Sequence, residues 1–209
     1  MCASLSRVAM LSLLLALGGL QAATPPILPD LTANSALPIN LNATSSEFDR
    51  RKNQLVFREL TITQGSLTIR AASAAAERLD FENSRWTFQG NVQIDSQGTR
   101  VFCDDATLTF LGHELRSAIL AGAPARFEQA RAGGQLTRGR AGSIDYDVTG
   151  GSLSLSRSAW INDGANEVSG DRIVYDLRRE YVTAQSGSSG PVRLKIDPDR
   201  RKQGSAPRP

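Results

Sequence analysis

Residues 86–94 read Trp86-Thr87-Phe88-Gln89-Gly90-Asn91-Val92-Gln93-Ile94, and this stretch decides the fold. Apart from Gly90, every second residue is apolar, which is typical of a β-strand that buries one face. A polar turn at Gln97-Gly98 follows, and a second strand is predicted from Val101 to Phe110. Together the two strands and their turn form the unit from which we expect the whole chain to be built.

This strand–turn–strand unit recurs about four times along the chain. Its other copies are predicted at Val56 to Ala76, Ala125 to Val148 and Leu153 to Leu177. Because one copy cannot bury its apolar face alone, we expect the copies to stack against one another. The sequence therefore predicts an all-β fold of stacked antiparallel strands. The segment Ala71 to Leu79 has helix propensity, but the alignment of the copies favours a strand there.

The second strand of each unit changes phase at a small residue. Cys103 and Ala106, for example, cannot both lie on one face of a regular strand, because side chains alternate between faces. The residues at the equivalent position of each unit are Ala71, Cys103, Ala141 and Gly170. Small residues permit a bulge or a bend. We therefore predict hairpins whose return strands turn a corner, so that they stack into two facing sheets.

The two ends of the chain differ in composition from this β region. Arg7 precedes an apolar run over residues 8–17, followed by small residues, so residues 1–22 are predicted to be a Sec-type signal peptide. An uncleaved membrane anchor is the alternative. Residues 23–36 are predicted to be a linker, and 37–185 the β domain. We expect residues 186–209 to be a flexible basic tail, within which Val192 to Ile196 could add a last strand.

The sequence gives little support for catalysis. His113 is the only histidine, and Asp104 and Asp105 point to opposite faces of a strand, so neither an acid–base pair nor a metal site is apparent. Once Cys2 is removed with the signal peptide, Cys103 remains alone and is expected to be a small buried filler. We expect no enzyme activity, catalytic residue, metal or cofactor. The formal net charge of +3 and the absence of a reading motif argue against nucleic acid as a partner.

Four segments resemble, in order, segments of the OstA-like family. They are Thr63-Gln64-Gly65, Phe88-Gln89-Gly90-Asn91-Val92, Gly122-Ala123-Pro124-Ala125-Arg126-Phe127 and Ser169-Gly170-Asp171-Arg172-Ile173-Val174-Tyr175. The resemblance covers roughly 37–185. Two departures are that Arg58-Glu59 and Arg157-Ser158 stand where the family has Gly-Asn, so altered bends are expected at both places.

The resemblance implies an open, twisted β-jellyroll in the periplasm of Gram-negative bacteria. Members carry lipopolysaccharide from the inner to the outer membrane, with the lipid A acyl chains in an apolar groove. They stack head to tail through edge strands and form a bridge between LptC at the inner membrane and the LptD–LptE translocon at the outer membrane. In the family an early Pro-Ile-x-Ile strand touches lipid, and here that segment is Pro38-Ile39-Asn40-Leu41.

We expect lipid contact from inward-facing apolar side chains near the open seam of such a groove. These candidates are Ile39, Leu41, Ile62, Phe88, Ile94, Phe127, Ile144 and Tyr146. The edges that would join neighbouring copies are expected at Ile39 and Leu41 on one side and at Tyr181, Val182 and Thr183 on the other. Two alternatives remain open. One is an LptC-like adaptor held by an N-terminal membrane helix, and the other is a periplasmic β-solenoid with a dry core that binds protein or polysaccharide.

Overall fold

The computed structural model describes residues 37–51, 53–77, 82–112, 114–130, 134–176, 178–179, 181–187 and 190–197. The predicted signal peptide, the linker, His113 and the last part of the tail lie outside these residues. The described residues form one 12-stranded sheet in which every pair of neighbouring strands is antiparallel. The all-β prediction is confirmed.

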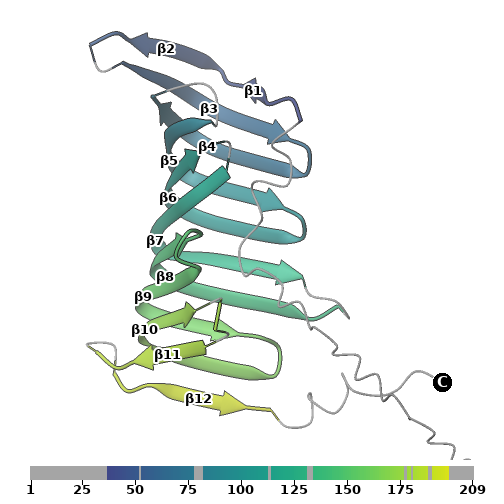
Figure 1. Cartoon of the computed structure of the whole chain (residues 1–209), viewed down its shortest axis with the longest axis vertical. Coiled ribbons are helices and arrows are strands. Elements are labelled where there is room, and N and C mark those ends of the chain that lie inside the picture. Colours follow the sequence, from purple (N-terminus) through teal and green to yellow (C-terminus); the bar gives the residue numbers. More distant parts are fainter. Residues whose placement is uncertain are drawn as a thin grey trace, which may run out of the picture.

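The strands follow one another through the sheet almost in sequence order (Figure 1). Their bounds are β1 Asn40–Asn42, β2 Ser45–Asp49, β3 Gln54–Gln64, β4 Leu67–Ala76, β5 Asn83–Ser96, β6 Thr99–Leu111, β7 Glu114–Ala130, β8 Leu136–Asp147, β9 Ser152–Asn162, β10 Asn166–Asp176, β11 Tyr181–Gln185 and β12 Arg193–Ile196. Both β1 and β2 pair with β3, and both β11 and β12 pair with β10. The segment 71–76 lies in β4, so its assignment as a strand is confirmed.

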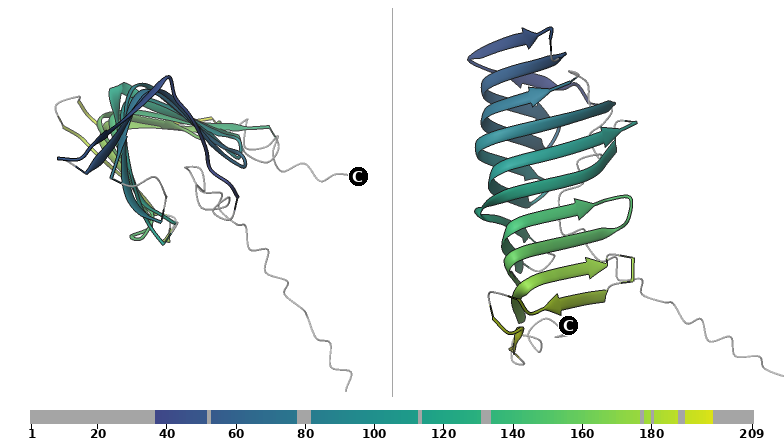
Figure 2. Two further views of the ribbon diagram at one scale, coloured as in Figure 1. Left: turned by 90° about the horizontal axis from the view of Figure 1, so that it is seen from above. Right: turned by 90° about the vertical axis from the view of Figure 1, so that its left-hand side faces the viewer.

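Each long strand bends near its middle, and the whole sheet folds along that line. Seen from above, the strands superpose into an angled outline with two arms (Figure 2). We call the arm that carries the turns at Gly65 and Gly98 wing A, and the arm that carries the connections near Arg51 and Gly112 wing B. The two facing sheets that we predicted are therefore the two wings of one continuous sheet.

The bends lie where the sequence predicted them. The strand register shifts between Arg70 and Ser73, between Phe102 and Asp105, between Arg140 and Ser143, and between Gly170 and Arg172. These intervals contain Ala71, Cys103 and Ala141 or begin at Gly170, the small residues at which the apolar pattern changes phase. A bulge leaves one residue unpaired and turns the strand, which resolves the change of phase.

The two departures from the Gly-Asn pattern have different outcomes. In β3 the pairing with β4 keeps one register from Arg58 to Leu60, and Glu59 alone has a positive φ of 48°. This bend is altered, as expected. In β9 the register does shift, and Arg157 and Ser158 take φ values of 66° and 62°. That bend resembles the one at Gly90-Asn91 (φ 76° and 49°), so the expectation of an altered bend is wrong there.

The core lies between the wings and consists of alternate residues from β3 to β10. In β5, for example, Trp86, Phe88, Val92 and Ile94 are at most 2% exposed. The rings of Phe57, Trp86 and Phe88 stack in a row, with centroids 6.1 Å and 5.9 Å apart. Burial of each large apolar side chain contributes about 1.5–3 kcal/mol, so this single cluster is the main source of stability.

Candidate functional site

The inner face of the folded sheet carries the buried apolar cluster described above. Among the described residues, its buried side chains are all uncharged. At the turns of wing A this face ends in a row of buried polar residues, which are Gln64, Ser96, Thr99, Gln129 and Thr137. Neighbouring members of this row are paired across strands, as Ser96 is with Thr99 and Thr99 with Gln129. The inner face thus has an apolar interior and an uncharged polar rim.

Most of the lipid-contact candidates lie on this inner face and are covered. Ile62, Phe88, Ile94, Phe127 and Ile144 are between 0% and 2% exposed. The ring of Phe127 lies over Gly139 of the next strand, where any larger residue would overlap it. Side chains at these positions contact a long apolar ligand only if the two wings move apart.

The other three candidates, Ile39, Leu41 and Tyr146, are half-buried and pack against the core. They belong to a larger set with the same property, which also contains Leu55, Val148, Ile161, Val168, Tyr175 and Ala184. Ile39, Leu41 and Leu55 lie at the first end of the sheet, and Ile161, Val168, Tyr175 and Ala184 lie on β9 to β11 at the other end. Tyr146 and Val148 lie where β8 ends on wing B. The apolar interior therefore reaches the surface at both ends. The sequence did not indicate that Ile161, Val168 and Tyr175 lie near an end of the sheet.

The two ends of the sheet have the same construction. Each ends in two short strands, one on each wing, because β1 and β12 extend wing A while β2 and β11 extend wing B. The predicted edge residues Leu41, Tyr181, Val182 and Thr183 lie in β1 and β11, and Ile39 directly precedes β1. No strand pairing joins the first end to the last among the described residues, so the sheet is open.

Large apolar side chains are exposed on these terminal strands. Phe48 of β2 is 51% exposed, Tyr181 of β11 is 61% exposed, and Leu194 and Ile196 of β12 are 62% and 51% exposed. Sequence analysis missed Phe48, because an alternating pattern in a strand as short as β2 is a weak signal. It anticipated β12 as a strand but not as part of an edge. Exposed edge strands with apolar side chains are surfaces on which a further strand can pair.

Cys103 and Asp104 carry groups that could take part in acid–base chemistry, but both have structural roles. Cys103 is 7% exposed, and its burial, together with the nearby carboxylates of Asp104 and Asp105, raises the pKa of its thiol from 9.0 to about 12. The thiol is thus protonated at neutral pH. The carboxylate of Asp104 accepts a hydrogen bond from the backbone N–H of Ala123 at 3.1 Å, which holds the bend of β7. The described residues contain no cluster of three or more potential metal ligands.

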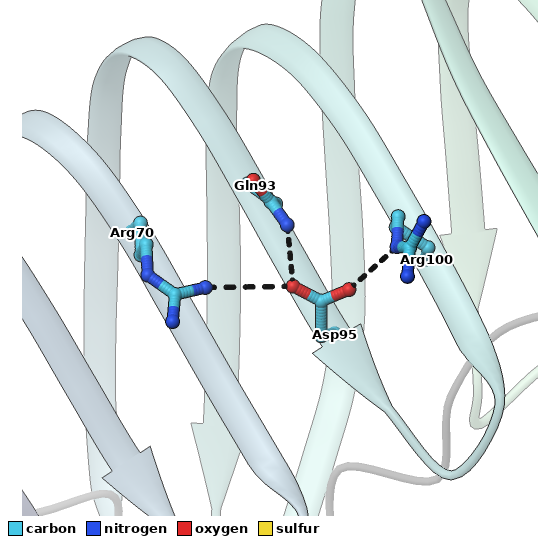
Figure 3. Close-up of polar contacts among 4 residues, drawn as sticks. All are labelled: Arg70, Gln93, Asp95 and Arg100. Atoms are coloured by element: carbon cyan, nitrogen blue, oxygen red, sulfur yellow. Dashed lines mark hydrogen bonds and ion pairs between the residues drawn. The ribbon is translucent and has the colours of Figure 1, made fainter.

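The outer face of wing A carries a row of paired charges. Asp95 of β5 accepts from Arg100 of β6 at 3.0 Å, lies 3.6 Å from Arg70 of β4 and accepts from Gln93 at 2.6 Å (Figure 3). Each exposed cross-strand pair of this kind contributes roughly 0.2–1 kcal/mol. The row ties consecutive strands together on the face opposite the core.

No described segment forms a helix with the length and hydropathy needed to cross a membrane.

Comparison with known proteins places these features in context. The family model described as LptA/(LptD N-terminal domain) LPS transport protein matches residues 72–181. A protein of Escherichia coli K12 named lipopolysaccharide export system protein LptA is 27% identical over 138 residues, which are 63% of this chain and 74% of that protein. The protein of the same name from Haemophilus influenzae is 21% identical over 167 residues, 79% of this chain and 80% of its own length. The crystal structure of LptH, an LptA-homologous periplasmic component of the lipopolysaccharide transport device of Pseudomonas aeruginosa, covers 79% of this chain and 99% of its own, with 21% identity and a TM-score of 0.41.

Proposed function

The chain belongs to the LptA/LptD N-terminal domain family of LPS transport proteins, and on that basis we propose that it binds lipopolysaccharide and carries it across the periplasm. The observation that carries the proposal is the open sheet with a continuous, uncharged apolar inner face. A closed barrel would offer no lateral route for a molecule with several acyl chains. An inner face interrupted by buried charges would oppose their passage.

The acyl chains are proposed to lie between the wings, and the sugars to remain outside. Transfer of each methylene group out of water is worth about 0.8 kcal/mol, so several chains provide ample free energy to separate two packed apolar surfaces. The polar rim of wing A, with Ser96 and Thr137 at the edge of the apolar interior, suits the region where the acyl chains join the sugars. A smooth apolar lining without fixed charged anchors also suits a ligand that must slide.

The route begins and ends where the interior reaches the surface. Ile39 and Leu41 are proposed to meet the lipid at the first end, and Tyr146 where β8 ends on wing B. Ile62, Phe88, Ile94, Phe127 and Ile144 are proposed to meet it between the ends, once the wings separate. The proposal therefore includes a motion of the two wings about the line of bends.

Site-specific photo-crosslinking in living Gram-negative cells tests this proposal. A photoreactive phenylalanine analogue is placed singly at Ile39, Phe88 and Tyr146, and at Ile119 as the control, since Ile119 is 46% exposed on the outer face. We expect lipopolysaccharide adducts at the first three positions and none at Ile119. If no inner position gives an adduct, the lipid groove is refuted and a β-solenoid with a dry core becomes the better description.

Copies of the chain are further proposed to stack head to tail. In a stack that continues the bend, β12 of one copy meets β1 of the next, and β11 meets β2. Leu194 and Ile196 would then face the strand of Leu41, and Tyr181 and Val182 the strand of Phe48. Such a contact joins unlike surfaces, so it extends into a filament and does not close into a dimer. LptC and the LptD–LptE translocon are proposed to take the places of the first and last neighbours.

The LptC-like adaptor is distinguished by the N-terminus of the mature protein. A periplasmic bridge protein is expected to lose its signal peptide, whereas the adaptor keeps an apolar N-terminal anchor. Intact-mass measurement of the exported protein decides between them. A mass that corresponds to cleavage near Ala22 supports the bridge, and an uncleaved chain recovered with the membrane supports the adaptor.

A further inference from the structure

A second row of side chains on the outer face of wing A is positively charged. It differs in this from the row of paired charges that contains Asp95 and Arg100. Its members are cross-strand partners on consecutive strands, namely Phe102, Arg126, Arg140, Trp160, Ser169 and Arg193. Arg126 and Arg140 lie directly opposite each other on β7 and β8, and both are exposed. Two like charges at opposite positions destabilise a sheet, so this arrangement costs stability unless something binds there.

The neighbouring row shows how the same strands arrange charges for stability. Two residues further toward the turns, Glu128 of β7 accepts from Arg138 of β8 at 3.2 Å. Arg126 and Arg140, in contrast, have no carboxylate partner among the residues that the structure describes. Their charge is thus free to attract an anion from solution.

Aromatic rings hold the two guanidinium groups in place. The Cζ atom of Arg126 lies 4.5 Å from the ring centroid of Phe102, and that of Arg140 lies 4.8 Å from the ring centroid of Trp160. Phe102 and Trp160 lie on the far sides of the arginine pair, so the two cations lean away from each other. A guanidinium stacked on a ring keeps its N–H groups at its edge, where they can bind an oxyanion.

The row leads into a cleft where β12 joins the sheet. The cleft has a volume of about 550 Å³, and its lining includes Arg140, Trp160, Glu167, Ser169, Arg193 and Lys195. Three cations thus stand against one carboxylate. The strands of Arg140 and Arg193 are three spacings apart in the sheet, roughly 14 Å at about 4.8 Å per strand. This span suits a chain of sugars with charged groups better than a single free anion.

We propose that this cleft binds an anionic saccharide. Phosphate or carboxylate groups bind Arg140, Arg193 and Lys195, while a sugar ring packs beside Trp160. Ser169 and the carboxylate of Glu167 accept hydrogen bonds from sugar hydroxyl groups. Glu167 would repel the closely spaced phosphates of a nucleic acid strand, which favours a sugar chain as the ligand. The charged residues of the cleft lie on the face opposite the proposed lipid groove, so the inference goes beyond the proposed function.

Two sources could supply such a ligand, and soluble probes distinguish them. The purified full chain is titrated by calorimetry with a phosphorylated mannotriose, trigalacturonic acid, neutral maltotriose and inorganic phosphate. We expect saturable binding of at least one charged trisaccharide that weakens as salt is raised. Preference for the phosphorylated probe indicates a phosphorylated sugar such as those of lipopolysaccharide cores, and preference for the other indicates a carboxylated glycan. None of these probes has an acyl chain, so the result does not depend on the lipid groove.

The substitution Arg140→Gln has a matched control in Arg138→Gln, on the same strand and face. We expect Arg140→Gln to weaken binding of the charged trisaccharide by about tenfold or more, because a charge-assisted hydrogen bond is lost. Lys195→Gln should weaken it in the same direction. Arg138→Gln should change the affinity by no more than about twofold, because Arg138 pairs with Glu128 and does not line the cleft.

Three results would overturn the proposal. One is the absence of saturable binding of either charged trisaccharide. Another is equal weakening by Arg138→Gln and Arg140→Gln, which would indicate general charge attraction without a site. The third is equally tight binding of maltotriose or of inorganic phosphate. Tight binding of maltotriose would show that the charge is not recognised, and tight binding of phosphate would show that the sugar is not.

Discussion

The aromatic ring of Phe127 lies directly over Gly139 on the adjacent strand, and the two residues are cross-strand partners. A methyl group at Gly139 would overlap the ring, so the glycine is needed here for space. Both residues lie in the interior of wing A, and Phe127 is 1% exposed. The position of the largest side chain in this part of the core thus depends on the absence of a side chain on its neighbour.

We predict that Gly139→Ala lowers the free energy of unfolding by about 1–3 kcal/mol, because the overlap forces Phe127 from its place. Urea denaturation measures the change. The double variant Phe127→Leu/Gly139→Ala should lose less stability than the sum of the two single variants, since the smaller side chain leaves room for the methyl group. Strict additivity of the two single changes would contradict the proposed contact.

The backbone at Glu59 offers a stabilising substitution. Its φ of 48° lies in the left-handed region, which costs a residue other than glycine about 1–2 kcal/mol. Glu59→Gly removes this cost but adds freedom to the unfolded chain, so we predict a net gain between zero and about 1 kcal/mol. Thermal unfolding is the measurement. The matched control Thr61→Gly, in the same strand without a positive φ, should lower stability by about 0.5–1 kcal/mol.

The buried thiol of Cys103 is expected to make the free energy of unfolding fall as pH rises in the alkaline range. Its pKa is raised from 9.0 to about 12 in the folded protein, so between these values the unfolded chain loses the proton while the folded chain keeps it. The folded state then binds more protons, and its stability falls as pH rises, by up to about 1.4 kcal/mol per pH unit. Chemical denaturation at pH 8 to 11 should show that the free energy of unfolding declines less steeply with pH for Cys103→Ala than for the wild type. Parallel curves for the two proteins would count against this origin.

The proposed head-to-tail contact predicts that the effect of a surface charge on association depends on its position. Leu194 on β12 and Leu111 on β6 are both exposed, at 62% and 53%, but only Leu194 lies on a terminal strand. We predict that Leu194→Glu reduces concentration-dependent association in sedimentation velocity by about tenfold or more, because a charge is buried without a partner. Leu111→Glu should sediment like the wild type. An equal effect of both substitutions, or of neither, would place the contact elsewhere.

The local pattern of the sequence was sufficient to predict the strands and their bends. Alternation over residues 86–94 predicted β5, and the change of phase at Cys103 predicted the bulge in β6. Both features depend on neighbouring residues alone, since side-chain direction has a period of two and small residues permit a bulge. The family's Gly-Asn pattern was a poorer guide at Arg157-Ser158, because larger residues can also adopt the left-handed backbone when the fold requires it.

The sequence could not show which inward-facing residues reach the surface. Phe88 and Tyr146 follow the same alternating pattern, yet Phe88 is 0% exposed and Tyr146 is half-buried. Tyr146 lies one residue before the end of β8 on wing B, whereas Phe88 lies near the middle of β5, and the burial of each depends on how the whole stack packs around it. The outer-face cleft was missed for a similar reason. Arg140, Trp160 and Arg193 are far apart in sequence, and only the strand register places them in one row.

The sequential strand order also has a consequence for evolution. Each of the long strands from β4 to β9 pairs only with the strand before it and the strand after it. The cross-section therefore repeats along the axis, and it does not depend on how many strands the sheet contains. Tandem duplication of one hairpin would therefore lengthen the molecule by about 10 Å and leave both terminal surfaces unchanged. The length of such a protein can therefore change by whole hairpins through gene duplication, while the contacts at its two ends stay the same.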